Sequence, residues 1–92
     1  MKDGLMVREP STGKERIGVL LFKEPGLNTR QVQHRVGGKY QNVRHLLSEM
    51  QEKRLVDTHL VRHYIPGISW ILMNEWKLTK RGEAWLQREN LL

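Results

Sequence analysis

Five polar side chains fall within one short stretch of the sequence, at spacings that place them on one side of a helix. They are Gln41, Asn42, Arg44, His45 and Ser48. Amide side chains form paired hydrogen bonds with adenine, and a guanidinium group does so with guanine N7 and O6. The stretch therefore favours recognition of base edges in DNA. The alternative is an ordinary solvated helix face, which carries the same residue types.

The helix that would position these side chains is predicted over residues 39–53. Its apolar residues follow the i, i+3, i+4, i+7 spacing, and they are Val43, Leu46, Leu47 and Met50. A shorter helix before it is expected to begin at Thr29, whose hydroxyl would cap it, and to end at Gly37-Gly38. Two helices this short must pack against each other and against a third element. The pair predicts a helix-turn-helix.

Two further helices are expected at the ends of this unit. A capping box at 12–15 starts a helix over residues 13–23, which Pro25 and Gly26 end. Thr79 caps a last helix over about residues 80–90, in which Gly82 permits a close approach between backbones. Residues 1–11 are predicted to be a flexible arm, and residues 12–92 a single domain.

Residues 55–78 predict a β-hairpin. Both arms alternate in the way that strands do, and Pro66-Gly67 fits the two central positions of a type II turn. A hairpin closed there pairs Val56 with Leu78. The second arm has apolar residues on both faces, so we expect both faces to be covered, which in so small a domain hints at a partner.

The order of these pieces resembles a known family. The sequence reads Thr-Arg-x-Val-x-x-x-Val-Gly at 29–37, Asn-Val-x-x-x-Leu-x-x-Met-x-x-x-x-Leu-Val at 42–56 and Leu-Thr-Lys-Arg-Gly at 78–82. This pattern is similar to that of the winged helix-turn-helix regulators of prokaryotes and phages, and the likeness covers residues 17–86. It departs from the pattern at Gly38, where the family usually has an apolar residue. The resemblance implies an α+β, mainly α fold with a three-helix core, a two-stranded wing and a C-terminal helix.

The resemblance also implies roles for particular residues. Helix 39–53 would enter the major groove of double-stranded DNA, with the five polar residues named above as readers. Wing 55–78 would lie on the adjacent backbone, and its tip at residues 62–69 would reach the phosphates or the minor groove. Contacts to phosphates are expected from Thr29, Arg30, Lys39, Tyr40, Arg62 and His63. A homodimer interface is expected at Val19, Phe22, Trp85 and Leu86, with the alternative that Trp85 only covers the first helix.

The expected function is that of a small transcriptional regulator or repressor that binds specific DNA sequences. The alternatives are a protein-interaction winged helix in a larger assembly and a plasmid or phage replication initiator. For the wing, Tyr64 and Ile65 could contact a protein instead of DNA.

The composition agrees with an anionic partner. The 92 residues carry a formal net charge of +6, and residues 29–63 hold seven Lys or Arg against three Asp or Glu. There is no cysteine, and the four histidines form no metal-binding or catalytic pattern, so we expect no enzyme activity, metal or cofactor. No apolar run reaches the length of a membrane span, which favours a cytoplasmic, nucleoid-associated protein.

Overall fold

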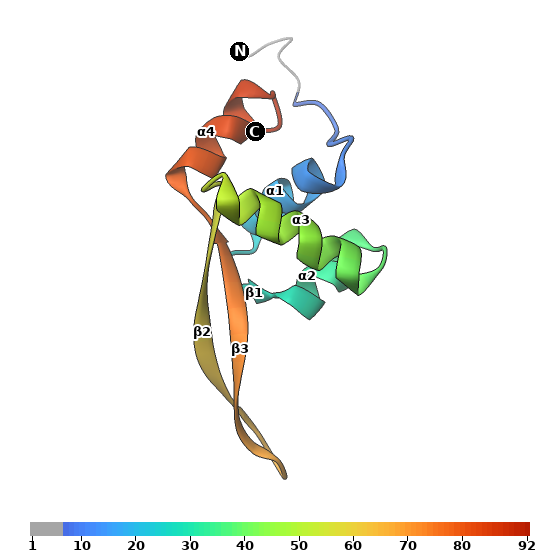
Figure 1. Cartoon of the computed structure of the whole chain (residues 1–92). Helices are drawn as coiled ribbons and strands as arrows, with labels where there is room; N and C mark the ends of the chain where they lie inside the picture. The colour runs from blue at the N-terminus through green and yellow to red at the C-terminus, as the bar shows by residue number, and fades with distance from the viewer. Residues whose placement is uncertain (1–6) are drawn as a thin grey trace.

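The computed structural model describes residues 7–92, and a long hairpin projects from a group of helices (Figure 1). The elements in chain order are α1 (Gly13–Lys23), β1 (Leu27–Asn28), α2 (Thr29–Val36), α3 (Tyr40–Glu52), β2 (Val56–Ile65), β3 (Ser69–Leu78) and α4 (Lys80–Arg88). The predicted mainly helical α+β class, with its helix-turn-helix, wing and C-terminal helix, is confirmed. The molecule measures 53 × 24 × 24 Å because the wing extends away from the body.

The start of α1 lies where the sequence predicts it. Thr12 Oγ1 accepts a hydrogen bond from the Glu15 backbone N–H at 3.1 Å. The Glu15 carboxylate does not complete the capping box, because it accepts the Ser11 backbone N–H at 2.9 Å and pairs with the Arg8 guanidinium at 2.7 Å. Arg8 also pairs with Glu89 at 3.2 Å. Residues 1–6 of the predicted arm lie outside the described residues, and at Arg8 the chain is held against α1 and the end of α4.

The cap of α2 is Asn28 and not Thr29 as predicted. Asn28 Oδ1 accepts the Gln31 backbone N–H at 2.8 Å, and Gln31 Oε1 accepts the Asn28 backbone N–H at 2.9 Å. This is a complete capping box, and Asn is a stronger cap than Thr. The Thr29 hydroxyl is thereby left to accept the Trp76 indole N–H at 2.9 Å. It ties the start of α2 to β3.

The turn between α2 and α3 depends on two glycines. Gly37 has φ 82° and ψ −179°, and Gly38 has φ 86°. The Gly37 conformation is nearly exclusive to glycine, so this residue ends α2 as predicted but in an extended form instead of the left-handed helical one. The Gln33 side chain closes the turn by donating to the Gly38 carbonyl at 2.8 Å. Lys39 then caps α3 without a side-chain hydrogen bond.

The hairpin has the predicted register, with Val56 opposite Leu78. At its tip, the Ile68 backbone N–H donates to the Ile65 carbonyl at 3.0 Å, and Gly67 has φ 85°, as a type II turn requires.

The prediction of a two-stranded wing is incomplete. The short strand β1 pairs antiparallel with β3, with Leu27 opposite Trp76, so the sheet has three strands in the order β1-β3-β2. A two-residue strand carries no alternation, and its pairing is therefore invisible to pattern analysis.

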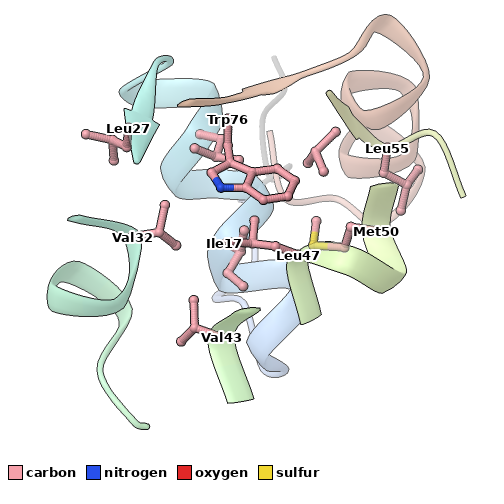
Figure 2. Close-up of a cluster of buried hydrophobic side chains, with 10 residues drawn as sticks. Ile17, Leu27, Val32, Val43, Leu47, Met50, Leu55 and Trp76 are labelled. Carbon is pink, nitrogen blue, oxygen red and sulfur yellow. The ribbon is translucent and has the colours of Figure 1, made fainter. Parts of the chain in front are cut away.

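The core lies between the three N-terminal helices and the base of the wing. Figure 2 shows the Trp76 ring at the centre of this cluster, with Ile17, Leu47 and Met50 around it. These three side chains are fully buried, and Trp76 is 4% exposed. The predicted buried stripe of α3 is confirmed, with Val43 at 3% and Leu46 at the edge. Burial of this stripe fixes which side of α3 faces outward.

Beyond the core, the two faces of the wing differ. Ile71 and Met73 are half-buried, whereas Trp70 is 55% exposed and Leu72 is 61% exposed. The expectation that both faces of this strand are covered is therefore wrong within this chain. The hairpin extends past the helices that would have to cover its second face (Figure 1).

At the other end of the wing, α4 packs closely on the rest of the body. Thr79 Oγ1 caps α4 by accepting the Gly82 backbone N–H at 2.9 Å. A Cβ placed on Gly82 would collide with the Leu55 carbonyl oxygen and would lie 2.7 Å from Leu78 Cδ1. The close backbone approach predicted at Gly82 is confirmed. Within residues 7–92, no helix is long and apolar enough to cross a membrane.

Candidate nucleic-acid interface

All five of the predicted base readers are exposed on one face of α3. Together they form what we call the polar face of α3: Gln41, Asn42, Arg44, His45 and Ser48. Four of them, all but Asn42, line a shallow depression. The first three lie in the N-terminal half of α3, which is the half that reads bases in helix-turn-helix proteins. The face is therefore accessible to a large partner.

One member of the polar face is already paired. His45 Nε2 lies 2.9 Å from Glu49 Oε2, and Lys14 Nζ lies 2.8 Å from Glu49 Oε1. The Lys14 ammonium, more than the imidazole, lowers the pKa of Glu49 below its usual value. Glu49 thus stays ionised and holds His45 in place, which brings a negative charge to the edge of the polar face. The i, i+4 spacing of His45 and Glu49 is the sequence signal that could have revealed this pair.

Arg44 differs from His45 in that it has no carboxylate partner among residues 7–92. An exposed guanidinium of this kind has its five donors available for a planar acceptor pair. Gln41 and Asn42 are also exposed and take part in no side-chain hydrogen bond within the described chain. The chemistry that the face offers is directional hydrogen bonding together with positive charge.

The predicted phosphate contacts at the start of α2 and α3 come together in one place. A hollow of about 250 Å³ lies between α2, α3 and β3, and Thr29, Arg30, Tyr40 and Asn74 are among its lining residues. The Arg30 guanidinium stacks on the Tyr40 ring, with Cζ 5.1 Å from the ring centroid. Lys39 is exposed beside it. The N-terminus of α2 adds backbone N–H groups and a partial positive charge, so the hollow suits an anion.

The two predicted contacts in the wing lie on opposite faces of the hairpin. Arg62 stacks on Trp70 with Cζ 5.1 Å from the ring centroid. His63 points to the other face, where its Nε2 lies 3.0 Å from Glu75 Oε2. Adjacent residues of a strand alternate between faces, so one flat ligand surface cannot meet both. Arg62 stays the predicted phosphate contact of its face, whereas the His63 ring is paired with Glu75 on the other face.

The four residues predicted for a dimer interface do not form one surface. Leu86 is fully buried, which corrects its assignment to an interface. Trp85 packs against Gly18, where an added Cβ would lie 2.8 Å from Trp85 Cζ3, so it covers α1 as the alternative held. Val19 and Phe22 line an apolar groove with the C-terminal leucines. Of the four predicted interface residues, Val19 and Phe22 remain available to contact a second copy of the chain.

Several contacts at the interface have no signal in the sequence. The Trp76–Thr29 hydrogen bond and the Arg30–Tyr40 stack join residues that are far apart in the chain or on different helices. The Asn28 cap, in contrast, was visible, because Gln31 stands three residues after it.

Comparison with known proteins places this geometry among transcriptional regulators of known structure. No family model matches the sequence, and no curated protein is a significant match. The transcriptional regulator PcaV from Streptomyces coelicolor, solved with its natural ligand, is similar with a TM-score of 0.67 and 28% identity over 92% of this chain and 57% of its own. ZitR from Lactococcus lactis, a zinc-responsive MarR family member, has a TM-score of 0.65 at 16% identity and covers 89% of this chain and 52% of its own.

A MarR family regulator from Silicibacter pomeroyi gives the same TM-score of 0.65 at 22% identity, over 88% of this chain and 51% of its own. The chain thus spans only a little over half the length of these proteins. ZitR and the Silicibacter pomeroyi protein are both MarR family members, and this chain shares their architecture. The predicted resemblance is confirmed: this chain has the winged helix-turn-helix fold of MarR-type transcriptional regulators.

Proposed function

We propose that this chain binds double-stranded DNA selectively and acts as a small transcriptional regulator. The observation that carries the proposal is the continuity of one cationic surface. The polar face of α3 begins at Gln41, directly after Tyr40, and Tyr40 lines the hollow that also contains Thr29 and Arg30. Base readers and an anion-binding hollow are therefore neighbours, as a helix in the major groove flanked by phosphates requires.

The residues divide into two roles. Gln41, Asn42, Arg44 and Ser48 contact base edges, and Arg44 is the strongest candidate because its guanidinium pairs with no carboxylate of residues 7–92. Contacts to phosphates come from the surroundings of the hollow and from the wing, and they are Thr29, Arg30, Lys39, Tyr40 and Arg62. His45 contributes only if DNA displaces Glu49 from it.

The likeness to MarR family regulators supports a role in transcription and not in catalysis. Such a protein would act in the cytoplasm, on the nucleoid. We also propose a homodimer that uses the groove at Val19 and Phe22, so that two copies of α3 read half-sites about one helical turn apart.

The test is a comparison of variants on duplex DNA selected from a random pool by the native protein. Arg44→Ala is expected to cost about 1–3 kcal/mol of binding free energy and to relax the preference at one base position. Lys39→Ala and Arg30→Ala are expected to weaken selected and unselected duplexes alike. Arg88→Ala, which removes an exposed cation of α4, is the matched control and should change little.

Three results bear on the proposal. Equal effects of Arg44→Ala and Arg88→Ala would contradict the assigned interface. A palindromic selected sequence supports the dimer. Failure of the pool to yield any preferred sequence would refute selective binding.

A further inference from the structure

The distal half of the wing carries an exposed apolar face that no part of the described chain covers. Its members share one side of the hairpin, and we call them the wing face: Leu60, Tyr64, Trp70 and Leu72. Each is between 55% and 61% exposed. Tyr64 lies directly opposite Trp70 in the sheet register, and their rings meet edge to face with centroids 5.4 Å apart. The wing face is therefore one continuous surface.

This surface is large for a small protein. With Ile68, which is 67% exposed at the tip, the exposed apolar area is on the order of 500 Å², near the upper end for patches on monomeric proteins. A strand face of this kind would ordinarily carry polar side chains toward water. The patch is thus expected to meet a partner.

The charges around the wing face restrict the chemistry of that partner. Arg62 lies on the same side and stacks on Trp70, and residues 60–73 contain no Asp or Glu. The acidic residues nearest in the sequence, Asp57 and Glu75, belong to the opposite face of the sheet. The partner must therefore offer flat or apolar surface together with negative charge.

A second copy of the chain meets this requirement poorly. Two wing faces pressed together would bury two Arg62 side chains, and the face holds no carboxylate to pair with them. Burying an unpaired cation is costly. Duplex DNA supplies phosphates for the guanidinium, and it supplies sugar edges and base planes for the rings.

The position of the wing face agrees with a DNA partner. Leu72 lines the same hollow as Arg30 and Tyr40, so the wing face continues from the proposed phosphate contacts toward the tip. The minor groove of B-DNA is only about 6 Å wide, and large side chains enter it by unstacking a base step and bending the duplex.

We propose that the wing is a wedge: Trp70, supported by Tyr64 and Leu72, inserts against a base step in the minor groove next to the site that α3 occupies, and bends the DNA. Arg62 contacts a phosphate beside the wedge. This inference rests on the proposed DNA binding, and it adds deformation of the duplex to the reading of bases.

The experiment uses the full chain and a selected duplex of about 30 base pairs, or three helical turns, with a fluorophore at each end. Energy transfer between the ends reports bending, and anisotropy reports affinity. Binding of the native protein should raise the transfer. Trp70→Ala should abolish that rise and weaken binding about 5- to 100-fold. Trp70→Phe should retain much of both.

Tryptophan emission gives an independent readout. Trp76 is buried and Trp85 is half-buried, so quenching by DNA would report mainly on Trp70 and should be lost in Trp70→Phe. The matched control is His59→Ala, which removes an exposed ring from the opposite face of the same hairpin, on β2, and should leave bending and affinity unchanged. Circular dichroism of each variant verifies the fold.

The outcomes separate the two proposals. Tight, salt-dependent binding by native protein with no bending, or with bending that Trp70→Ala leaves intact, overturns the wedge and preserves DNA binding. Absence of duplex binding even at low salt overturns both. Loss of self-association in Trp70→Ala, measured by sedimentation and without any effect on bending, identifies a second copy as the occupant and also overturns the wedge.

Discussion

At the scale of single residues, Glu15 and Glu49 show two uses of a carboxylate on neighbouring surfaces. Glu15 joins the segment before α1 to α1 through Ser11 and Arg8, and Arg8 extends the link to the end of α4 through Glu89. Glu49 instead stands beside the polar face of α3, where it pairs with Lys14 and His45. We therefore expect Glu15 to affect the stability of the domain, and Glu49 to affect the proposed binding of DNA.

Stability is expected to fall in acid because of Glu15. The hydrogen bond from Arg8 is the main cause that lowers the pKa of Glu15 from 4.5 to about 2, and the Ser11 N–H adds to it. Because the folded-state pKa is below the unfolded one, the stabilisation is full above pH 4.5 and is lost as the pH falls toward 2. Urea unfolding across this range should show the decline. Arg8→Ala should flatten it, and an equal slope in that variant would contradict the assignment.

Glu49→Gln is expected to strengthen DNA binding. The change removes a negative charge beside the polar face and releases His45, which lies 2.9 Å from the carboxylate. The gain should be several-fold at low ionic strength and should shrink with added salt, because it comes from screened charge. Anisotropy with a labelled duplex measures it. Glu83→Gln, on the exposed surface of α4, is the control, and an equal gain there would indicate a general charge effect.

At the scale of elements, periodicity and turn residues predicted the helices and the hairpin register, since Pro66-Gly67 and the alternation of both arms agree on one pairing. The pattern could not predict β1, which has only two residues, or the hydrogen bond that draws Thr29 toward Trp76. Both depend on contacts between distant parts of the chain. The candidate site on α3 could be predicted from the apolar spacing of the helix. Burial of Val43 and Leu47 on one side decides which residues of α3 face outward.

Gly82→Ala is expected to destabilise the domain by about 3 kcal/mol, since the added methyl meets the Leu55 carbonyl and the Leu78 side chain. Gly38→Ala is the comparison. A methyl group added at Gly38 meets no other atom within 4 Å. The positive φ of 86° is the remaining obstacle, and it should cost about 1–2 kcal/mol of stability. Chemical denaturation measures both. A smaller loss for Gly82→Ala than for Gly38→Ala would contradict the close packing of α4.

Ser69→Gly is expected to stabilise the wing by roughly 0.5–1 kcal/mol. Ser69 follows the turn with φ 111°, a conformation that residues with a Cβ rarely adopt, and glycine removes the strain. Ser69→Ala retains the Cβ and should show no such gain. If both variants change the free energy of unfolding alike, the backbone at Ser69 is not strained.

At the scale of the whole molecule, the two ends of the long axis carry different surfaces. The wing tip lies at one end, and the C-terminal segment, near the groove of Val19 and Phe22, lies toward the other (Figure 1). Between them lies the polar face of α3, with the hollow lined by Thr29, Arg30 and Tyr40 beside it. This arrangement allows one molecule to meet DNA along its side and a second copy near its C-terminal end. The sequence alone predicted double-stranded DNA and a second copy of the chain as partners. It could not show that Leu86 is buried while the wing face is exposed to solvent.

The central claim is that the surface of α3, the hollow and the wing binds DNA phosphates. The most direct measurement is the affinity for a labelled duplex across a series of salt concentrations. About three cationic phosphate contacts per protomer, from Arg30, Lys39 and Arg62, predict that log K falls with log salt at a slope of roughly −3. Arg30→Ala should reduce that slope by about one, and Arg88→Ala should leave it unchanged. An affinity that does not vary with salt, or a slope that neither substitution changes, would contradict the account.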